Sequence, residues 1–466
     1  MKNLMMIGSA LLVLSSSAYA SQARLLALGM NETDNEGMYH ISDERNIFLN
    51  PAYINIYNNM AIAEWGSVGS YARVTAASGL GTTGTSTATL NDAANPKAQG
   101  GVFKKYGDYV YGLYLGNESN TSSLLRVAGT SAASTFDKFN GAGTVESKML
   151  STADNQVDLF FGGDNGLKWA INPVLTFGKD ETRGAKDSGY SVRGGVIASN
   201  WDAHLNLSLG SKSEAYEGIT SPADALSQQV SDEFKGSIGF HIGGSYILSG
   251  KNRVFGYVKH YGWEQTDNFA SYATTNGINL GASAGTGIGG QQGTVKGDFT
   301  SYYLGWGSEY DVNTTDRLFY SLAAKKTDIN LEFSNKSEVR NLILPLTIGY
   351  EAQALEWLTL RGSVVQNLWG TRDNKNINNY TGATGTRLNR VASGLITGIY
   401  GGSGKTTITN STKINAGATL KFGQFSVDGL IGATSGSRAG AVGSNTNTGA
   451  LAFDNLETSV AMTYKF

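Results

Sequence analysis

The chain has 466 residues, a formal net charge of −2 and no cysteine. So balanced a charge argues against nucleic acid as a partner, and without cysteine no disulfide bond contributes to stability. Glycine is abundant, with 61 residues, whereas proline is scarce, with 5. Scarce proline favours a structure built from strands, because proline donates no hydrogen bond to a β-ladder.

Residues 1–20 have the pattern of an export signal. A single cation, Lys2, precedes an apolar run at residues 4–14, and the small residues Ala18 and Ala20 stand at the positions that a signal peptidase reads. The run is shorter than the roughly 20 apolar residues that a membrane-spanning helix needs, and no other segment approaches that length. We therefore predict removal of residues 1–20 and export of a chain that is either soluble or a membrane β-barrel.

The next segment, residues 21–58, is too long and too patterned to be a simple leader to a strand. It carries one early cation, Arg24, and acidic residues that include Asp43 and Glu44. Such charges are costly in lipid and stable in a wet lumen. We therefore predict a plug inside a barrel at residues 21–58, with a periplasmic tail packed on the barrel rim as the alternative.

Residues 59–466 alternate between strand-like segments and turns. The last segment, LETSVAMTYKF, places Val460, Met462 and Tyr464 on one face and polar residues on the other. Lipid can contact one face of such a strand and a lumen the other. The predicted strands are residues 59–69, 98–106, 109–117, 156–163, 167–179, 190–199, 201–210, 235–248, 253–263, 298–311, 317–326, 341–354, 357–369, 412–422, 424–431 and 456–466.

This pattern predicts an all-β fold, a transmembrane antiparallel β-barrel of about sixteen strands, with fourteen to eighteen compatible. Short turns belong on the periplasmic side and long loops outside, so both barrel ends face the periplasm and the last strand pairs with the first. The long polar loops, at residues 118–155, 264–297 and 370–411, could each fold inward and narrow the pore. Aromatic residues at strand ends, among them Tyr257 and Trp263, are assigned to the membrane interfaces.

Alternation along the strands also predicts the residues that face the lumen. They are Lys168, Arg193, His204, His241, Glu309, Arg361, Lys413, Lys421 and Asp428. Because they include both cations and anions, they predict a water-filled passage with weak charge selectivity. The alternative is that these residues pair with one another and only stabilise the wall.

Two resemblances add to this interpretation. Arg24 precedes Ala-Leu-Gly-Met, and Asp43 precedes Asn50, Pro51 and Ala52, which is similar to the N-terminal segment of FadL-type outer-membrane barrels. That resemblance implies an N-terminal hatch inside the barrel and transport of hydrophobic compounds, although Asn31 and Glu32 replace the family's usual two glycines. The chain as a whole resembles the porin-like major outer-membrane proteins of Bdellovibrio-like predatory bacteria.

The sequence therefore predicts an outer-membrane porin for passive diffusion of small polar solutes. The alternatives are a FadL-type transporter of hydrophobic compounds and a structural or surface-recognition barrel with an occluded lumen. No enzyme is expected, and no cofactor or metal, because the histidines lack metal-ligand spacing. The expected partners are outer-membrane lipids, small solutes and, by resemblance, the barrel-assembly machinery during insertion, while a homotrimer and a monomer are both compatible with the sequence.

Overall fold

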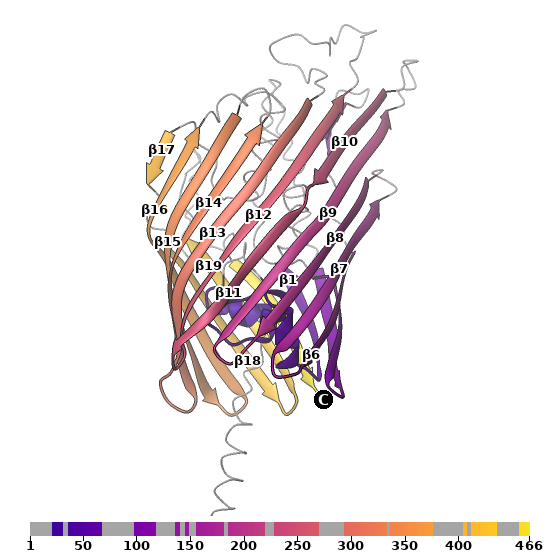
Figure 1. Ribbon diagram of the computed structural model, residues 1–466. Helices are drawn as coiled ribbons and strands as arrows, with labels where there is room; N and C mark the ends of the chain where they lie inside the picture. The colour runs from indigo at the N-terminus through magenta and orange to yellow at the C-terminus, as the bar shows by residue number, and fades with distance from the viewer. Residues whose placement is uncertain are drawn as a thin grey trace, which may run out of the picture.

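The chain forms a closed antiparallel β-barrel (Figure 1). The computed structural model describes residues 21–30, 36–67, 97–117, 136–139, 145–148, 155–180, 185–219, 228–269, 293–332, 336–375, 404–407, 412–435 and 456–466. The strands are β1 (Met60–Ser67), β2 (Lys97–Tyr106), β3 (Tyr109–Leu115), β4 (Phe136–Phe139), β5 (Val145–Lys148), β6 (Asn155–Asp164), β7 (Lys168–Asp180), β8 (Ala185–Ile197), β9 (Trp201–Ile219), β10 (Gln228–Gly236), β11 (Gly239–Ser249), β12 (Asn252–Phe269), β13 (Gly293–Asp311), β14 (Asp316–Glu332), β15 (Lys336–Leu355), β16 (Leu358–Lys375), β17 (Gly404–Thr407), β18 (Thr412–Phe422), β19 (Phe425–Ser435) and β20 (Leu456–Lys465).

The wall has sixteen strand positions, as the sequence predicts. Eighteen strands belong to the main sheet, but two positions each hold two successive strands. β10 and β11 both pair with β9 and β12, and β17 and β18 both pair with β16. The remaining two strands, β4 and β5, form a separate hairpin within the region predicted as an extracellular loop.

The barrel closes between its first and last strands. β1 pairs with β20 from Met60↔Lys465 to Ser67↔Thr458, and the Phe466 backbone N–H donates to the Asn59 carbonyl over 3.0 Å. The C-terminus lies at the end of the barrel where the short hairpin turns gather (Figure 1). This is the predicted periplasmic end. The predicted signal at residues 1–20 lies outside the described residues, as do residues 376–403 of the predicted loop at 370–411.

Several strands extend further towards the extracellular end than the sequence predicts. β9 reaches Ile219 instead of residue 210, and β12 reaches Phe269 instead of residue 263. In these extensions both faces are polar, so hydrophobic alternation stops although the hydrogen-bond ladder continues. Charged side chains pair across the strands there, as between Lys212 Nζ and Glu233 Oε1 at 3.0 Å.

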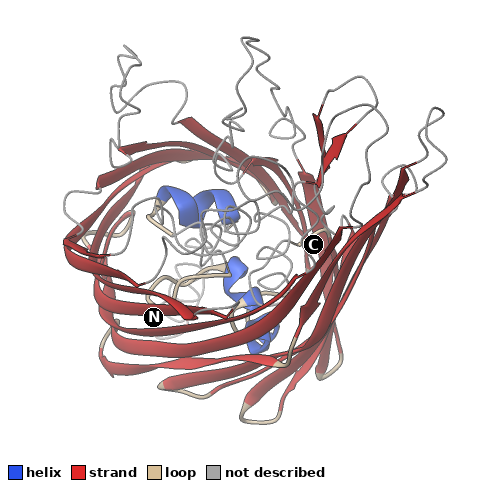
Figure 2. Ribbon diagram, turned by 90° about the horizontal axis from the view of Figure 1, so that it is seen from above, coloured by secondary structure: helices blue, strands red, loops and turns tan. Residues whose placement is uncertain are grey.

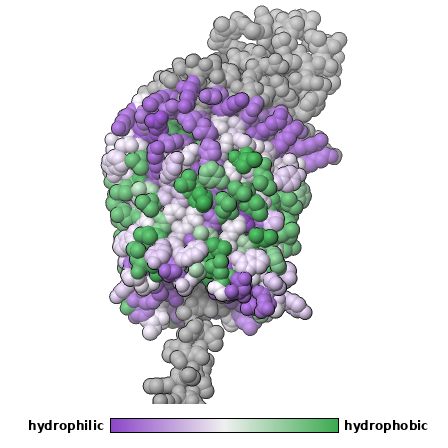
Figure 3. All heavy atoms as spheres, in the orientation of Figure 1, coloured by the Kyte–Doolittle hydropathy of each residue, from purple (hydrophilic) through white to green (hydrophobic). Residues whose placement is uncertain are grey.

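The two faces of the wall differ as an outer-membrane barrel requires. Along β9, Leu205 is 42% and Leu209 is 54% exposed, whereas the alternating His204, Asn206 and Ser208 are buried. On the face that Figure 3 shows, hydrophobic residues form a band across the middle of the barrel and hydrophilic residues lie towards its extracellular end. Such a band matches the hydrocarbon core of a bilayer, so the protein resides in the outer membrane. None of the described helices is long and apolar enough to cross a membrane.

Two aromatic residues assigned to the membrane interface lie elsewhere. Tyr257 and Trp263 of β12 are buried on the inner face, together with Phe255 and Tyr261. Both faces of this strand are rich in apolar residues, so alternation alone does not decide which face points inward. The inner face of β12 is therefore largely aromatic, in contrast to the polar lumen that the sequence predicts.

A proline inside the wall is compensated by a neighbouring side chain. Pro173 in β7 has no backbone N–H, and the ladder between β6 and β7 is interrupted beside it. The Asn172 side chain donates instead to the Leu159 carbonyl over 2.9 Å. Arg193 donates to the Asn172 amide oxygen and forms an ion pair with Asp158. These contacts satisfy buried polar groups that the proline would otherwise leave unpaired.

Candidate functional site: the hatch and the inner wall

Residues 21–30 and 36–58, here called the hatch, lie inside the ring of strands (Figures 1 and 2). The hatch contains helix α2 (Gln22–Ala27) and two 3-10 helices, η3 (Glu44–Phe48) and η4 (Pro51–Asn55). Each begins after a capping residue, because the side chains of Ser21, Asp43 and Asn50 accept hydrogen bonds from backbone N–H groups of the first turn. Local sequence therefore specifies these short helices, and contacts with the wall hold them in place.

The strongest contact between hatch and wall is a buried ion-pair network. The Arg24 guanidinium is fully buried and lies 2.8 Å from Asp43 Oδ2 and 2.9 Å from Glu351 Oε2. Arg361 lies 3.1 Å from the same Glu351 carboxylate and 2.9 Å from Asp428. Cations and carboxylates alternate through this network, so each buried charge has an opposite partner, as burial requires.

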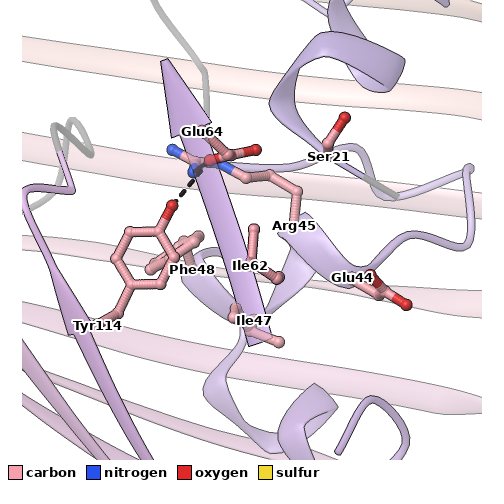
Figure 4. Close-up of a pocket in the computed structure, with 8 residues that line it drawn as sticks. All are labelled: Ser21, Glu44, Arg45, Ile47, Phe48, Ile62, Glu64 and Tyr114. Atoms are coloured by element: carbon pink, nitrogen blue, oxygen red, sulfur yellow. Dashed lines mark hydrogen bonds and ion pairs between the residues drawn. The ribbon is translucent and has the colours of Figure 1, made fainter. Parts of the chain in front are cut away.

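A second ionic contact joins the hatch to the first strand. Arg45 Nη1 lies 3.0 Å from Glu64 Oε2, and its Nη2 donates to the Asn117 side chain over 2.9 Å. The Tyr114 hydroxyl donates to Glu64 over 2.8 Å, and Figure 4 shows the side chains of Arg45, Glu64 and Tyr114 converging. A small cavity is present here, and its lining residues are Ser21, Glu44, Arg45, Ile47, Phe48, Ile62, Glu64 and Tyr114.

The Asn50-Pro51-Ala52 segment docks on strands β8 and β9. The Asn50 side-chain amide donates to the backbone carbonyls of Val196 in β8 and Ala203 in β9, each over 3.2 Å. Its amide oxygen accepts from the Ala52 N–H over 3.0 Å. One asparagine therefore caps η4 and fixes it to two strands at once.

Glycines on the inner face allow the hatch to approach the wall closely. A Cβ added at Gly417 would lie 2.8 Å from Ala27 Cβ, and one at Gly243 would lie 2.6 Å from the Tyr39 hydroxyl. Both distances are shorter than van der Waals contact. The glycines whose added Cβ would meet hatch atoms are Gly162, Gly195, Gly243, Gly307, Gly349 and Gly417. Part of the high glycine content therefore serves the contact between hatch and wall.

A cluster of histidines lies where the hatch meets β9, β11 and β12. The Tyr39 hydroxyl is 2.8 Å from His204 Nε2, and His241 Nδ1 is 3.3 Å from Glu36 Oε2. Lys259 Nζ lies 3.7 Å from the same Glu36 oxygen. Burial opposes ionisation of Glu36, but Lys259 and the contact with His241 outweigh it and lower the pKa of Glu36 to about 2. The carboxylate is therefore charged across the physiological range.

Above the hatch, the inner wall carries a row of apolar side chains. Strand registers align Tyr261 with Phe299, Phe299 with Ile329, and Ile329 with Val339. All four are buried on the inner face. The row is two residues further along β12 than Lys259, which contacts the hatch. At about 3.4 Å per residue this places the row about 7 Å to the extracellular side of that contact.

The residues predicted to line the pore divide into three groups. Arg193, His204, His241, Glu309, Arg361 and Asp428 face inward and are buried at or near the hatch. Lys413 and Lys421 also share the inner face but are only partly buried. Lys168 lies beside a short turn, where it pairs with Asp164 over 3.0 Å. Arg193, His204, His241 and Glu309 therefore contact hatch residues, and Arg361 and Asp428 belong to the ion-pair network that also holds Arg24.

The predicted plug residues all lie in the hatch. Arg24, Asp43 and Asn50 make the contacts described above, and Pro51 and Ala52 are buried in η4. Three wall residues that hold the hatch were absent from the prediction, namely Glu64, Lys259 and Glu351. Alternation places each of them on the inner face, and a search for inward carboxylates opposite hatch arginines could have found Glu64 and Glu351. Among the described residues, no group of three or more histidine, aspartate or glutamate side chains could hold a metal ion.

Comparisons with known proteins find similarity to solved structures. No family model matches the chain, and no curated protein matches it. A FadL homologue of Pseudomonas aeruginosa is 12% identical, with a TM-score of 0.39 over 92% of this chain and 96% of its own. The toluene transporter TodX of Pseudomonas putida is 9% identical, with a TM-score of 0.31 over 96% of this chain and 98% of its own. At TM-scores below 0.5 these likenesses carry no conclusion about solute or mechanism, and the resemblance to proteins of predatory bacteria stays a prediction.

Proposed function

We propose that this outer-membrane barrel is a transporter of hydrophobic compounds whose passage is closed by the hatch. The observation that carries the proposal is the hatch itself, which is buried in the barrel and joined to the wall by ion pairs on several sides. A passive diffusion porin needs an open aqueous path. Because ion pairs hold the hatch on the wall, we infer that the passage is closed and opens only when the hatch or the wall rearranges.

The apolar row above the hatch supports the choice of solute. Tyr261, Phe299, Ile329 and Val339 face the interior and not lipid. These side chains are buried in this structure, so they would meet a solute only after the hatch or the inner wall rearranges. An apolar row uncovered in this way would suit a solute with an apolar body. Lys259 and Ser301 form the polar row directly beneath it, next to the hatch. The wall would therefore hold an apolar solute just before the point where the passage is closed.

The test compares conductance with uptake of an apolar probe. Purified protein in planar bilayers is expected to show no steady large conductance, whereas protein in liposomes is expected to speed entry of N-phenyl-1-naphthylamine. Ile329→Asn should reduce that uptake about tenfold, because it removes an apolar contact of about 1.5 kcal/mol from the row. Ile348→Asn is the matched control, since Ile348 lies on the outer face and is 47% exposed.

The outcomes separate the candidate functions. Steady large conductance without probe uptake would favour the diffusion porin that the sequence first predicts. Neither conductance nor uptake would favour a structural or surface-recognition barrel. Equal loss of uptake in both variants would show that the row has no special part in transport.

A further inference from the structure

The hatch lies across the seam, the pair of strands β1 and β20 that closes the barrel. Two adjacent residues of η3 contact the two sides of this seam. Arg45 Nη1 lies 3.0 Å from Glu64 Oε2 on β1, and Glu44 Oε1 lies 3.0 Å from Lys465 Nζ on β20. Figure 4 shows the side chains of Glu44 and Arg45 leaving η3 in different directions, with Arg45 at Glu64. One short helix of the hatch therefore connects the first strand of the wall to the last.

Further contacts hold the hatch on both strands of the seam. Phe48 of η3 belongs to the same buried apolar cluster as Met60 of β1. Ala461 of β20 belongs to a second buried cluster, which contains the apolar side chains of α2. The Gln22 backbone N–H of α2 also donates to Glu64 on β1 over 2.7 Å. The hatch thus covers the inner side of the seam with apolar contacts as well as ion pairs.

The seam joins the two ends of the barrel sequence. Met60 pairs with Lys465, whereas the rest of the wall joins strand positions that follow one another along the chain. Bringing distant segments together costs conformational entropy that grows with their separation, so such a pair forms slowly. Arg45 and Glu64 are 19 positions apart, so the hatch can attach to β1 before the end of the chain arrives. It then presents the Glu44 carboxylate at the place where Lys465 lies in the closed barrel.

We propose that the hatch has a second role as a clamp of the seam, in which Glu44 and Arg45 join β20 to β1 and hold the barrel closed. Glu44 meets Lys465 when the hatch is docked and β20 is in place. Their contact therefore favours the closed seam over the open one, and by linkage the closed seam favours the docked hatch. The clamp concerns assembly and stability of the wall, and it does not rest on the solute proposed above.

Hydrogen exchange of the backbone amides in β1 and β20 measures opening of the seam. Glu44→Gln and Lys465→Gln should each accelerate this exchange about tenfold, because each removes the ionic hydrogen bond between the hatch and β20. Exchange around Phe299 and Ile329, on strands β13 and β14 away from the seam, should stay unchanged. The double variant should be accelerated by less than the product of the two single effects, because both residues act through one contact.

Lys168→Gln is the matched control for Lys465→Gln. Lys168 Nζ also lies 3.0 Å from a carboxylate, that of Asp164, and the two lysine side chains are similarly exposed, at 36% and 30%. The control pair, however, joins strands β6 and β7, which a short turn already connects. Lys168→Gln should therefore leave exchange in the seam unchanged. Heat-dependent gel migration confirms that each variant is folded, and Lys465→Gln decides the test if Glu44→Gln fails to assemble, because it leaves the buried part of the hatch unchanged.

A crosslinked seam separates the clamp from a general loosening of the hatch. The chain contains no cysteine, so Ala63→Cys with Met462→Cys gives a single pair of thiols at opposed positions of β1 and β20. Once a short thiol crosslinker joins them, the seam cannot open, and Glu44→Gln should no longer accelerate exchange there. Unchanged exchange in both single variants, or acceleration that persists after crosslinking, would overturn the clamp. Neither result depends on probe uptake, so the proposed transport is decided by its own test.

Discussion

Replacing Arg24 with alanine is expected to undock α2 from the wall at a cost of about 3 kcal/mol in local stability. The substitution leaves Asp43 buried without its cation and removes one of the two arginines that share Glu351. Breaking a buried ion pair from one side typically costs 3 to 5 kcal/mol. We take about the lower figure, because Arg361 still pairs with Glu351. Hydrogen exchange of the backbone amides in residues 25–30 should accelerate about a hundredfold, since 1.4 kcal/mol corresponds to a factor of ten.

The same variant should change passage through the barrel. If α2 closes the lumen, planar bilayers with Arg24→Ala should show conductance that the unmodified protein lacks. Arg340→Ala is the matched control, because Arg340 pairs with Glu338 on the exposed outer face, where an ion pair contributes about 0 to 1 kcal/mol. Burial raises the pKa of Asp43 to about 7 even beside Arg24. A second variant, Arg24→Ala with Asp43→Asn, replaces this buried carboxyl with an amide and should recover part of the protection. Unchanged exchange in Arg24→Ala would contradict the role assigned to this network.

The wall could be predicted from the sequence because its signal is local. In β9, His204 and Leu205 differ in polarity from one residue to the next, and the hydrogen-bond ladder imposes that period of two on the fold. The predicted strand ends were wrong where both faces of a strand become polar, as in β9 beyond residue 210. There the strand leaves the membrane, so the sequence no longer needs an apolar face although the ladder continues.

Contacts between hatch and wall could not be predicted because they join distant residues. Arg24 and Glu351 are separated by 327 positions, and no local pattern relates them. The sequence predicts both a plug and a set of inward charges on the wall, but no local pattern shows which of these charges the plug covers. Once a hatch occupies the lumen, the same inward position of Arg361 leads to a buried ion pair. The assignment of Tyr257 in β12 to the membrane interface was wrong for another reason. Residues such as Val258 and Tyr257 make both faces of this strand apolar, so alternation does not show which face points inward.

The glycines of the inner wall give a second test of hatch docking, one that depends on shape and not on charge. A Cβ at Gly195 would overlap the Asn50 amide oxygen and lie 3.0 Å from Pro51 Cδ. Gly195→Ala is therefore expected to displace Asn50, with loss of its hydrogen bonds to Val196 and Ala203. Overpacking costs about 1 to 3 kcal/mol, and each lost hydrogen bond about 0.5 to 1.5 kcal/mol.

The neighbouring glycine supplies the control. Gly194 lies on the outer face of β8, and the nearest atom to its added Cβ is the Leu205 carbonyl oxygen at 3.8 Å, so Gly194→Ala should leave the hatch docked. Hydrogen exchange of the Tyr53 amide in η4 and of the Ile56 amide, which caps its end, should accelerate about thirtyfold or more in Gly195→Ala and stay unchanged in Gly194→Ala. Adding Asn50→Ala to Gly195→Ala removes the clashing side chain, so the double variant should lose less than the sum of the two single changes. Equal acceleration in both glycine variants would mean that the alanine weakens strand β8 itself, and that the close approach at Gly195 does not hold the hatch.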